Sequence, residues 1–255
     1  MTRRPLLILA GVVAVAFGAC NSTPPASPLS DPKEILVGAL EAVQAAGTFH
    51  FEADVSGSIA LGLGGQGAGA PLDLTGTTAE GEVDVAGGNA RVAFSTPALL
   101  GLSGEVISIG DDSYLKISLF GDAYQKFTRG PSDPIGALGD PQQTIADLRT
   151  ALDELPAPPT KAPDEKCGDS DCYRVSVELS NIDLGGLLGA PDSAAQATLD
   201  AWVRTDDLRP AKLAIVADSG SDDALTVTIE LTRWDEPVSI SAPPADQVVE
   251  GSLGP

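Results

Sequence analysis

The sequence feature that most constrains the fold is an alternation of apolar and polar side chains that begins at Thr48 and recurs through most of the chain. In its first run, Phe49 and Phe51 alternate with polar residues such as His50. Successive side chains of a β-strand point to opposite faces, so a period of two predicts strands with one apolar and one polar face. The pattern returns in 72–94, 106–119, 173–179 and 198–232, with Gly, Asn or Asp at the breaks, which favours a meander of antiparallel strands over βαβ units.

Two segments show helical spacing instead. In 31–47, Asp31 is suited to cap a helix, Pro32 fits its first turn and Glu34 completes a capping-box pattern. An apolar stripe follows at intervals of three and four residues, and Gly47 is a natural stop. Residues 141–155 form a similar stripe, which predicts a second helix.

Nine to eleven strands and two helices predict an α+β fold, in which the helices lie across the apolar face of a large curved antiparallel sheet. Aromatic residues make up only 4% of the chain, so Val, Leu, Ile, Ala and Gly must form the inner wall. Such a wall permits an apolar cavity, and a filled, well-packed core is the alternative. From alternation alone, we assign the following residues to the inner wall, where they would line such a cavity: Phe51, Val55, Ile59, Val83, Val85, Val92, Phe94, Ile117, Val175 and Val177.

The N-terminus has the order of parts of a secretory signal peptide: Arg3 and Arg4, an apolar run over 6–17, then small residues before Cys20. The run is shorter than the roughly 20 residues that a membrane-spanning helix needs. Its end resembles a bacterial lipobox, with Phe17 where Leu is usual, and the resemblance implies lipidation of Cys20. The alternative is a plain secretory peptide in which Cys20 is incidental.

These features divide the chain into a signal peptide (1–19), a lipidated and disordered Ser/Pro-rich tether (20–30), one domain (31–249) and a tail (250–255). The formal charge is −21, and without the two arginines of the signal it is about −21 − 2 = −23. This charge argues against nucleic acid and against anionic lipid surfaces as partners, because both would repel the protein. Attachment to a membrane must then come from N-terminal acyl chains.

The two internal cysteines, Cys167 and Cys172, lie five residues apart in a segment expected beyond the membrane, where disulfides persist. We therefore predict a disulfide between them. A zinc site is the alternative, but it needs four ligands and the chain has a single histidine.

The sequence does not predict an enzyme. His50 falls on a polar strand face, and the chain has no GxSxG motif, so Ser-His-Asp chemistry lacks a base. Acidic pairs such as Asp111–Asp112 lie in predicted turns, where Asp serves backbone hydrogen bonding. We expect Trp202 and Trp234 to be core or rim anchors rather than platforms for sugars, and we expect no cofactor and no metal.

The order of elements resembles the actinobacterial cell-envelope lipoproteins of the LppX/LprG/LprA/LprF type. The resemblance lies in TFHFEADVSG, ISIGDDSYLKIS, DAWVRTDDLRPAKLAI and the closing LTRWDEPVSISAPP. It implies a LolA-like half-barrel whose cavity accepts acyl chains of envelope lipids or lipoglycans and helps to move them. It also implies a place on the outer face of the bacterial cytoplasmic membrane, and leaves a membrane transporter open as a partner. The alternative is a surface lipoprotein with a filled core that acts as an adaptor or sensor.

Overall fold

A computed structural model describes residues 28–59, 71–128, 141–183, 194–217 and 224–250. The predicted signal peptide, Cys20 and most of the tether lie outside these residues. The α-helices are α1 (Pro32–Ala45) and α3 (Pro141–Asp153). The strands are β1 (Thr48–Ser56), β2 (Ser58–Ile59), β3 (Leu72–Asp73), β4 (Thr77–Asp84), β5 (Asn89–Thr96), β6 (Leu102–Ile109), β7 (Asp112–Ile117), β8 (Tyr124–Thr128), β9 (Thr160–Lys161), β10 (Glu165–Cys167), β11 (Ser170–Asp183), β12 (Ala194–Arg204), β13 (Pro210–Ala217), β14 (Leu225–Thr232) and β15 (Val248–Glu250).

Thirteen of these strands form one open, curved sheet, in the order β10-β11-β12-β13-β14-β1-β4-β5-β6-β7-β8-β15, with β9 added beside β11. The first long strand, β1, pairs with the last long strand, β14, and these two strands lie at the centre of the sheet. Every pair is antiparallel except β15 with β8, which is parallel. The predicted α+β half-barrel is therefore confirmed, with one parallel edge strand that the alternation did not predict.

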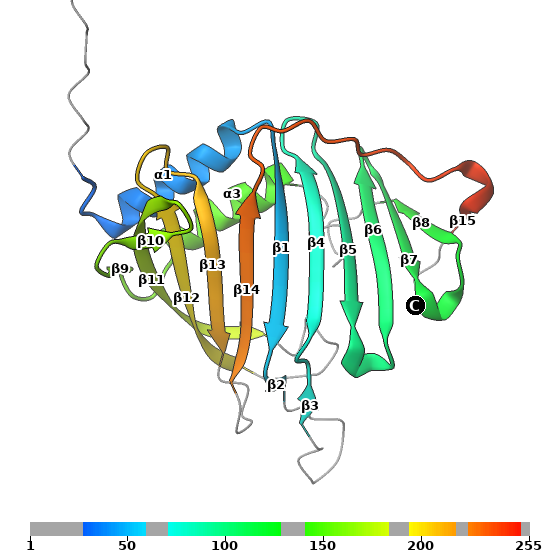
Figure 1. The fold of residues 1–255 in the computed structure, drawn as a ribbon, viewed down its shortest axis with the longest axis horizontal. Helices are drawn as coiled ribbons and strands as arrows, with labels where there is room; N and C mark the ends of the chain where they lie inside the picture. Colours follow the sequence, from blue (N-terminus) through cyan, green and yellow to red (C-terminus); the bar gives the residue numbers. More distant parts are fainter. Residues whose placement is uncertain (1–27, 60–70, 129–140, 184–193, 218–223, 251–255) are drawn as a thin grey trace, which may run out of the picture.

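Both helices lie against one face of the sheet, which we call the inner face; Figure 1 views the molecule from the outer face, with α1 and α3 behind β11–β14, β1 and β4. The Asp31 side chain accepts hydrogen bonds from the backbone N–H groups of Lys33 (2.8 Å) and Glu34 (3.1 Å), as the cap prediction required. The helix ends at Ala45, two residues before the predicted stop at Gly47, and Ala46 is its C-cap. Its buried Ile35 packs on Val175 and Val203 of the inner face.

The segment after β14 (236–250) runs along one rim of the sheet to the far edge, where it ends in β15 (Figure 1). From here on we call this segment the C-terminal tail; it precedes the short tail 250–255 that the sequence predicted. Ile240 and Val248 of this tail pack on a cluster of Ile107, Tyr114 and Tyr124. These three side chains alternate with the inner set of β6–β8, so they lie on the outer face. The sheet thus has a helix-covered half (β11–β14, β1 and β4) and a tail-covered half (β5–β8).

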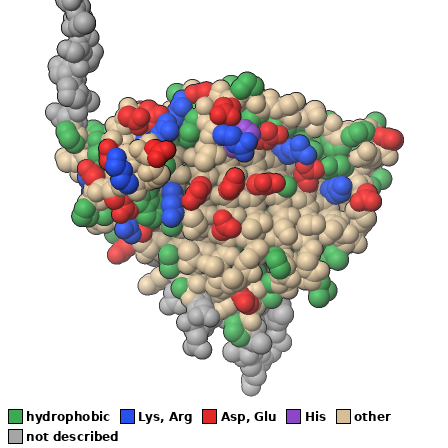
Figure 2. Space-filling view, viewed as in Figure 1, with side chains coloured by type: hydrophobic (Ala, Val, Ile, Leu, Met, Phe, Trp, Pro, Cys, Tyr) green, Lys and Arg blue, Asp and Glu red, His purple; other side chains and the backbone are tan. Residues whose placement is uncertain are grey.

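Charged side chains gather on the outer face, mainly over the helix-covered half and the upper rim, whereas much of the lower part of this face is free of them (Figure 2). The polar members of the alternation in β1 and β4, such as Glu52 and Glu80, are exposed there. His50 lies on this face, opposite Glu82 in the register, as the alternation predicted. No helix in the described residues is both long and apolar enough to cross a membrane.

Candidate lipid-binding cavity

An apolar cavity of about 370 Å³ lies between the two helices and the inner face of the helix-covered half. Among its lining residues, Thr144 has the only polar side chain, and none is ionisable. From the helices and the segment after α3 come Leu36, Ala39, Leu40, Val43, Pro141, Thr144, Ile145, Leu148, Ala151, Leu152 and Leu155. From the sheet and the start of β13 come Phe49, Val83, Ala90, Val177, Leu179, Leu199, Ala201, Val203, Pro210, Leu213 and Leu231.

The helices supply half of this wall because each carries one apolar stripe. Residues three and four apart share a face of a helix, so Leu36, Leu40 and Val43 of α1 all reach the cavity. On the solvent side, the ammonium of Lys33 lies 2.9 Å from the Asp153 carboxylate, which links α1 to the end of α3. This pair is exposed and contributes little stability, so the shared apolar stripes hold the helices in place.

Small and branched aliphatic side chains keep the space open. Ala39, Ala90 and Ala201 are buried and leave room where larger residues would meet. At the rim, the ring of Phe49 packs on Trp234 with centroids 5.1 Å apart, and the Arg209 guanidinium lies over the same tryptophan ring. Trp234 is thus a rim anchor, as expected.

The rim is fastened by polar contacts outside the cavity. Asp235 accepts a hydrogen bond from the Gly47 backbone N–H (2.9 Å) and forms an ion pair with Arg209. The hydrogen bond from Gly47, followed by the one from Arg209, lowers the pKa of the Asp235 carboxyl below its ordinary value. The Thr48 hydroxyl donates to the Glu236 carbonyl at 2.5 Å, which fixes the start of the C-terminal tail.

The structure divides the residues that alternation assigned to the inner wall. Val83 and Val177 line the cavity, and Val175 is fully buried in the core beneath α1. Val85 is buried beside α3, and Val55 packs on a separate cluster that includes Ala217 and Leu225. These five residues share the inner face, but only two of them border the cavity.

Four of the remaining assigned residues lie elsewhere on the inner face, and the fifth, Ile59, belongs to the separate β2–β3 sheet. The rings of Phe51 and Phe94 lie so close over Gly81 and Gly104 of the neighbouring strands that a Cβ there would come within 2.6 Å of them. Val92 and Ile117 are half-buried on the inner face of the tail-covered half. Ile59 pairs with Leu72 at the end of β2, and its side chain lies outside the described part of the structure.

Sequence reasoning missed the helical half of the wall. The stripes of 31–47 and 141–155 were the available signal, because an amphipathic helix must bury its apolar face against something. Alternation specifies which face of a strand is apolar, but the distance between that face and its cover depends on tertiary packing.

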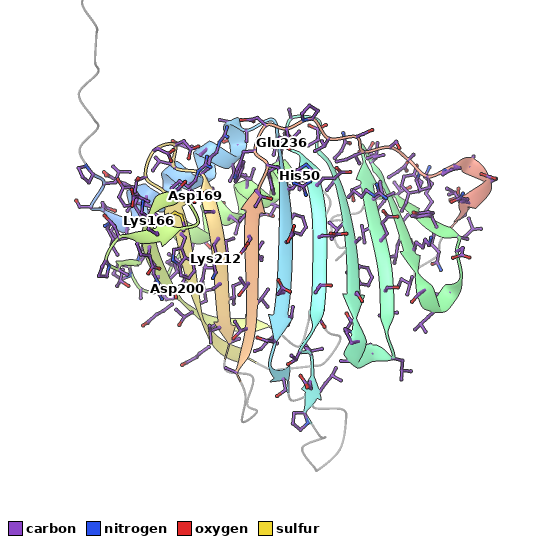
Figure 3. The ribbon with its side chains drawn as sticks, viewed as in Figure 1. His50, Lys166, Asp169, Asp200, Lys212 and Glu236 are labelled. Carbon is purple, nitrogen blue, oxygen red and sulfur yellow. A yellow bond between two sulfur atoms is a disulfide. The ribbon has the colours of Figure 1, made fainter. Side chains whose placement is uncertain are left out.

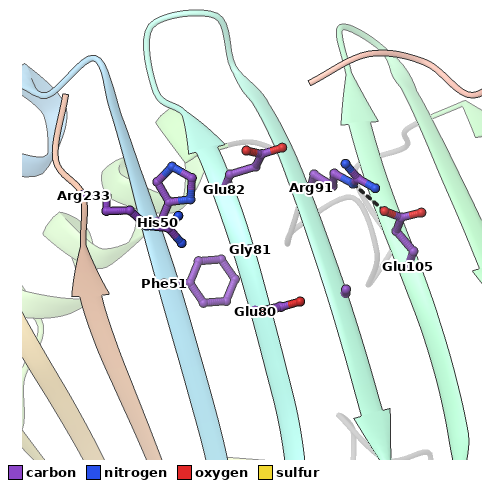
Figure 4. A pocket seen from close by; sticks show the side chains of 9 residues that line it. His50, Phe51, Glu80, Gly81, Glu82, Arg91, Glu105 and Arg233 are labelled. Atoms are coloured by element: carbon purple, nitrogen blue, oxygen red, sulfur yellow. Dashed lines mark hydrogen bonds and ion pairs between the residues drawn. The ribbon is translucent and has the colours of Figure 1, made fainter. Parts of the chain in front are cut away.

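The outer face carries the polar features. A shallow hollow near its upper rim is bordered by His50, Glu82 and Arg233, with Arg91 paired to Glu105 beside it (Figure 4). Trp202, farther along this face, lies between Arg174 and Lys212, each about 5.1 Å from its ring centroid. Cations from both neighbouring strands therefore lie over this indole, which fits an anchor rather than a platform for sugars.

Cys167 and Cys172 form the predicted disulfide, which closes the β10–β11 hairpin. This hairpin, labelled by Lys166 and Asp169 in Figure 3, is held to the outer face because Trp202 Nε1 donates a hydrogen bond to Glu165. In the described residues, no group of three or more His, Cys, Asp or Glu side chains could hold a metal ion.

An open half-barrel with helices on its inner face defines the class of fold. No protein-family model and no curated protein matches the sequence. Among solved structures, lipoprotein LppX of Mycobacterium tuberculosis matches with a TM-score of 0.53 and 15% identity over 82% of this chain and 98% of LppX. LprF from Mycobacterium bovis matches with a TM-score of 0.50 and 16% identity over 85% of this chain and 99% of LprF.

The chain therefore has the fold of these mycobacterial lipoproteins, as the resemblance of its sequence layout predicted. The LolA superfamily protein NE2245 from Nitrosomonas europaea matches with a TM-score of only 0.29 and 12% identity over 86% of this chain and 97% of NE2245, which is too low to establish the same fold.

Proposed function

We propose that this protein binds acyl chains of envelope lipids or lipoglycans in the cavity beneath α1 and α3 and carries them within the bacterial cell envelope. The observation that carries the proposal is a cavity of about 370 Å³ with a single polar side chain, Thr144, in its wall. Removing an acyl chain from water is favourable by about 0.8 kcal/mol per CH₂ group. The described wall has no ionisable group, which suits such a ligand and leaves no side-chain acid or base there for catalysis.

The proposal places the domain 31–249 at the outer face of the cytoplasmic membrane. Cys20, released from the signal peptide 1–19, would carry the acyl anchor, and the tether 20–30 would connect it to α1. The backbone N–H of Leu29 donates to the Tyr173 hydroxyl at 3.1 Å. This hydrogen bond attaches the segment before α1 to the helix-covered half. A membrane transporter would receive or supply the lipid. The anchor is tested by replacing Cys20 with Ala, which must abolish incorporation of labelled palmitate.

The cavity is tested by filling it. In the variant Leu199→Trp, a larger ring on the inner face of β12 displaces the ligand, whereas Thr198→Trp puts the same ring on the exposed outer face. Native mass spectrometry of the protein purified from its host, followed by solvent extraction, measures the bound lipid. We expect a stoichiometric mass excess in the wild type and in Thr198→Trp, and its loss in Leu199→Trp.

A wild-type protein that carries no lipid and takes up no fluorescent acyl probe would contradict the carrier function. It would favour the adaptor or sensor role that the sequence left open. Circular dichroism of both variants establishes that they are folded before their lipid content is compared.

A further inference from the structure

Two turns at the same end of the tail-covered half present large apolar side chains to solvent. The turn after β5 contains Leu99, which is 43% exposed, and Leu100, which is 95% exposed. The turn after β7 contains Leu119 and Phe120, which are 67% and 68% exposed. We call these four residues the apolar tips; both turns lie at the lower right in Figure 1, and Figure 2 shows hydrophobic side chains along that edge.

The two turns lie on either side of the beginning of β6. Thr96, just before the first turn, pairs with Leu102, and Ile117, just before the second, pairs with Gly104. The Ser103 backbone N–H also donates to the Ser118 hydroxyl at 3.1 Å. Since neighbouring strands are about 4.8 Å apart, the apolar tips lie close enough to act on one surface together.

The backbone of the first turn does not favour a leucine at its most exposed position. Leu100 has φ 59°, in the left-handed region where Gly and Asn are tolerated and most other side chains are disfavoured. Its side chain gains almost no burial in return. Neither local conformation nor packing explains this residue, and an outlier of this kind points to a role outside the fold.

The surroundings of the apolar tips are almost uncharged. Residues 96–104 contain no charged side chain, and residues 117–123 contain one, Asp122, in a chain whose formal charge is −21. Protein-binding patches combine an apolar core with a polar rim. These four side chains instead project from two narrow turns in which Asp122 is the single charged residue. Leu and Phe at protruding positions are suited to the boundary between lipid headgroups and acyl chains.

We propose that the apolar tips insert into the interfacial layer of a lipid bilayer. The acidic remainder of the protein stays off the surface, because anionic headgroups repel it. This contact is separate from the cavity and from the N-terminal anchor, since it depends only on Leu99, Leu100, Leu119 and Phe120. It supplies the lipid-exchange contact that a carrier needs, and it would exist equally in a protein with an empty cavity.

The first test measures depth in the membrane. The full-length protein is reconstituted with phosphatidylcholine vesicles whose acyl chains carry bromine, which quenches tryptophan only on close approach. With Trp202 and Trp234 replaced by Phe in both reporters, we expect Phe120→Trp to be quenched at least twofold more than Val216→Trp, whose position on β13 is 43% exposed. The difference should persist at high salt, because apolar insertion is not screened. Equal quenching of the two reporters, or none, would overturn the proposal, and no quenching is also the outcome that a protein-docking role predicts.

The second test separates membrane contact from lipid binding. The double variant Leu100→Asn/Phe120→Ser removes two of the tips, and Asn is suited to the left-handed conformation at position 100. We expect loading of a fluorescent acyl probe from phosphatidylcholine vesicles to slow about tenfold, while the amount bound at equilibrium stays the same. An unchanged loading rate would refute the role of the tips, whereas absence of bound probe in the wild type would refute only the proposed cavity function.

Discussion

In the helix-covered half of the sheet, the inner face packs against α1 and α3, whereas in the tail-covered half the outer face packs against the C-terminal tail. Both halves consist of antiparallel strands of one sheet, but their covers differ in shape. Two helices span a curved surface and leave about 370 Å³ between them and the sheet. A single extended tail follows the surface closely, and Tyr114 and Tyr124 fill the contact. The shape of the cover, rather than the strands, therefore decides where the molecule is hollow.

The largest effect is expected from removing the contact between helix and sheet in the helix-covered half. Ile35 is fully buried in the core beneath α1, so Ile35→Ala should lower the free energy of unfolding by roughly 2–5 kcal/mol and release bound lipid. Urea denaturation monitored by circular dichroism measures the change. Leu148→Ala on α3 is the control, since Leu148 is half-exposed and should lose much less stability. Equal losses in the two variants would contradict a core held by α1.

The second effect concerns the polar contact under the C-terminal tail. Tyr124 donates a hydrogen bond to Glu105, which is also paired with Arg91. Tyr124→Phe should cost roughly 1.5–3 kcal/mol, because it removes a hydrogen bond to a charged group, while lipid content should not change. Chemical denaturation at pH 7, with native mass spectrometry in parallel, measures both quantities.

The same residue predicts a dependence on alkaline pH. Burial, followed by the hydrogen bond to Glu105, raises the pKa of Tyr124 to about 12. The folded protein thus holds the phenolic proton more tightly than the unfolded chain, whose tyrosine pKa is about 10. This contribution to stability is complete below pH ~10 and is lost as the pH rises toward ~12. Denaturation midpoints between pH 8 and 12 should fall less steeply in Tyr124→Phe than in the wild type, and parallel curves would argue against this assignment.

A smaller effect is expected where the C-terminal tail meets the outer cluster. Val248→Ala removes two methyl groups that contact this cluster, at a cost of about 1 kcal/mol. Because β15 pairs with β8, the loss of stability should be local to this edge of the sheet. Hydrogen exchange should therefore accelerate at the backbone amides of β8 and stay unchanged in β12. Val249→Ala is a matched control, since the side chain of Val249 is 49% exposed.

The smallest effect is expected at the rim of the helix-covered half, where the C-terminal tail begins. The pKa of Asp235 is lowered by hydrogen bonds from Gly47 and Arg209, so its contribution to stability is present at neutral pH. It is lost as the pH falls through and below the ordinary carboxyl value of about 3.9. The free energy of unfolding should therefore decrease slightly less steeply below pH 4 in Asp235→Asn than in the wild type. Asp122→Asn, in the exposed turn after β7, is the control for a general loss of one negative charge.

The sequence by itself determined the local geometry. Alternation placed Val83, Val175 and Val177 on one face of their strands, and Asp31 and Pro32 marked the start of α1. These features depend on neighbours within a few residues, where chain stereochemistry dictates the outcome. The prediction of the Cys167–Cys172 disulfide likewise needed only their spacing and compartment.

Only the tertiary structure decided which face of each half is covered. In β6, Val106 and Ile107 are both apolar and point to opposite faces, so the pattern there left the buried face open. The C-terminal tail buries Ile107 from more than a hundred residues away, and α3 completes a cavity with strands from both ends of the chain. Such contacts join segments remote in sequence, and no local period encodes the distance between a sheet and its cover. The cavity and the apolar tips are therefore properties of the assembled fold.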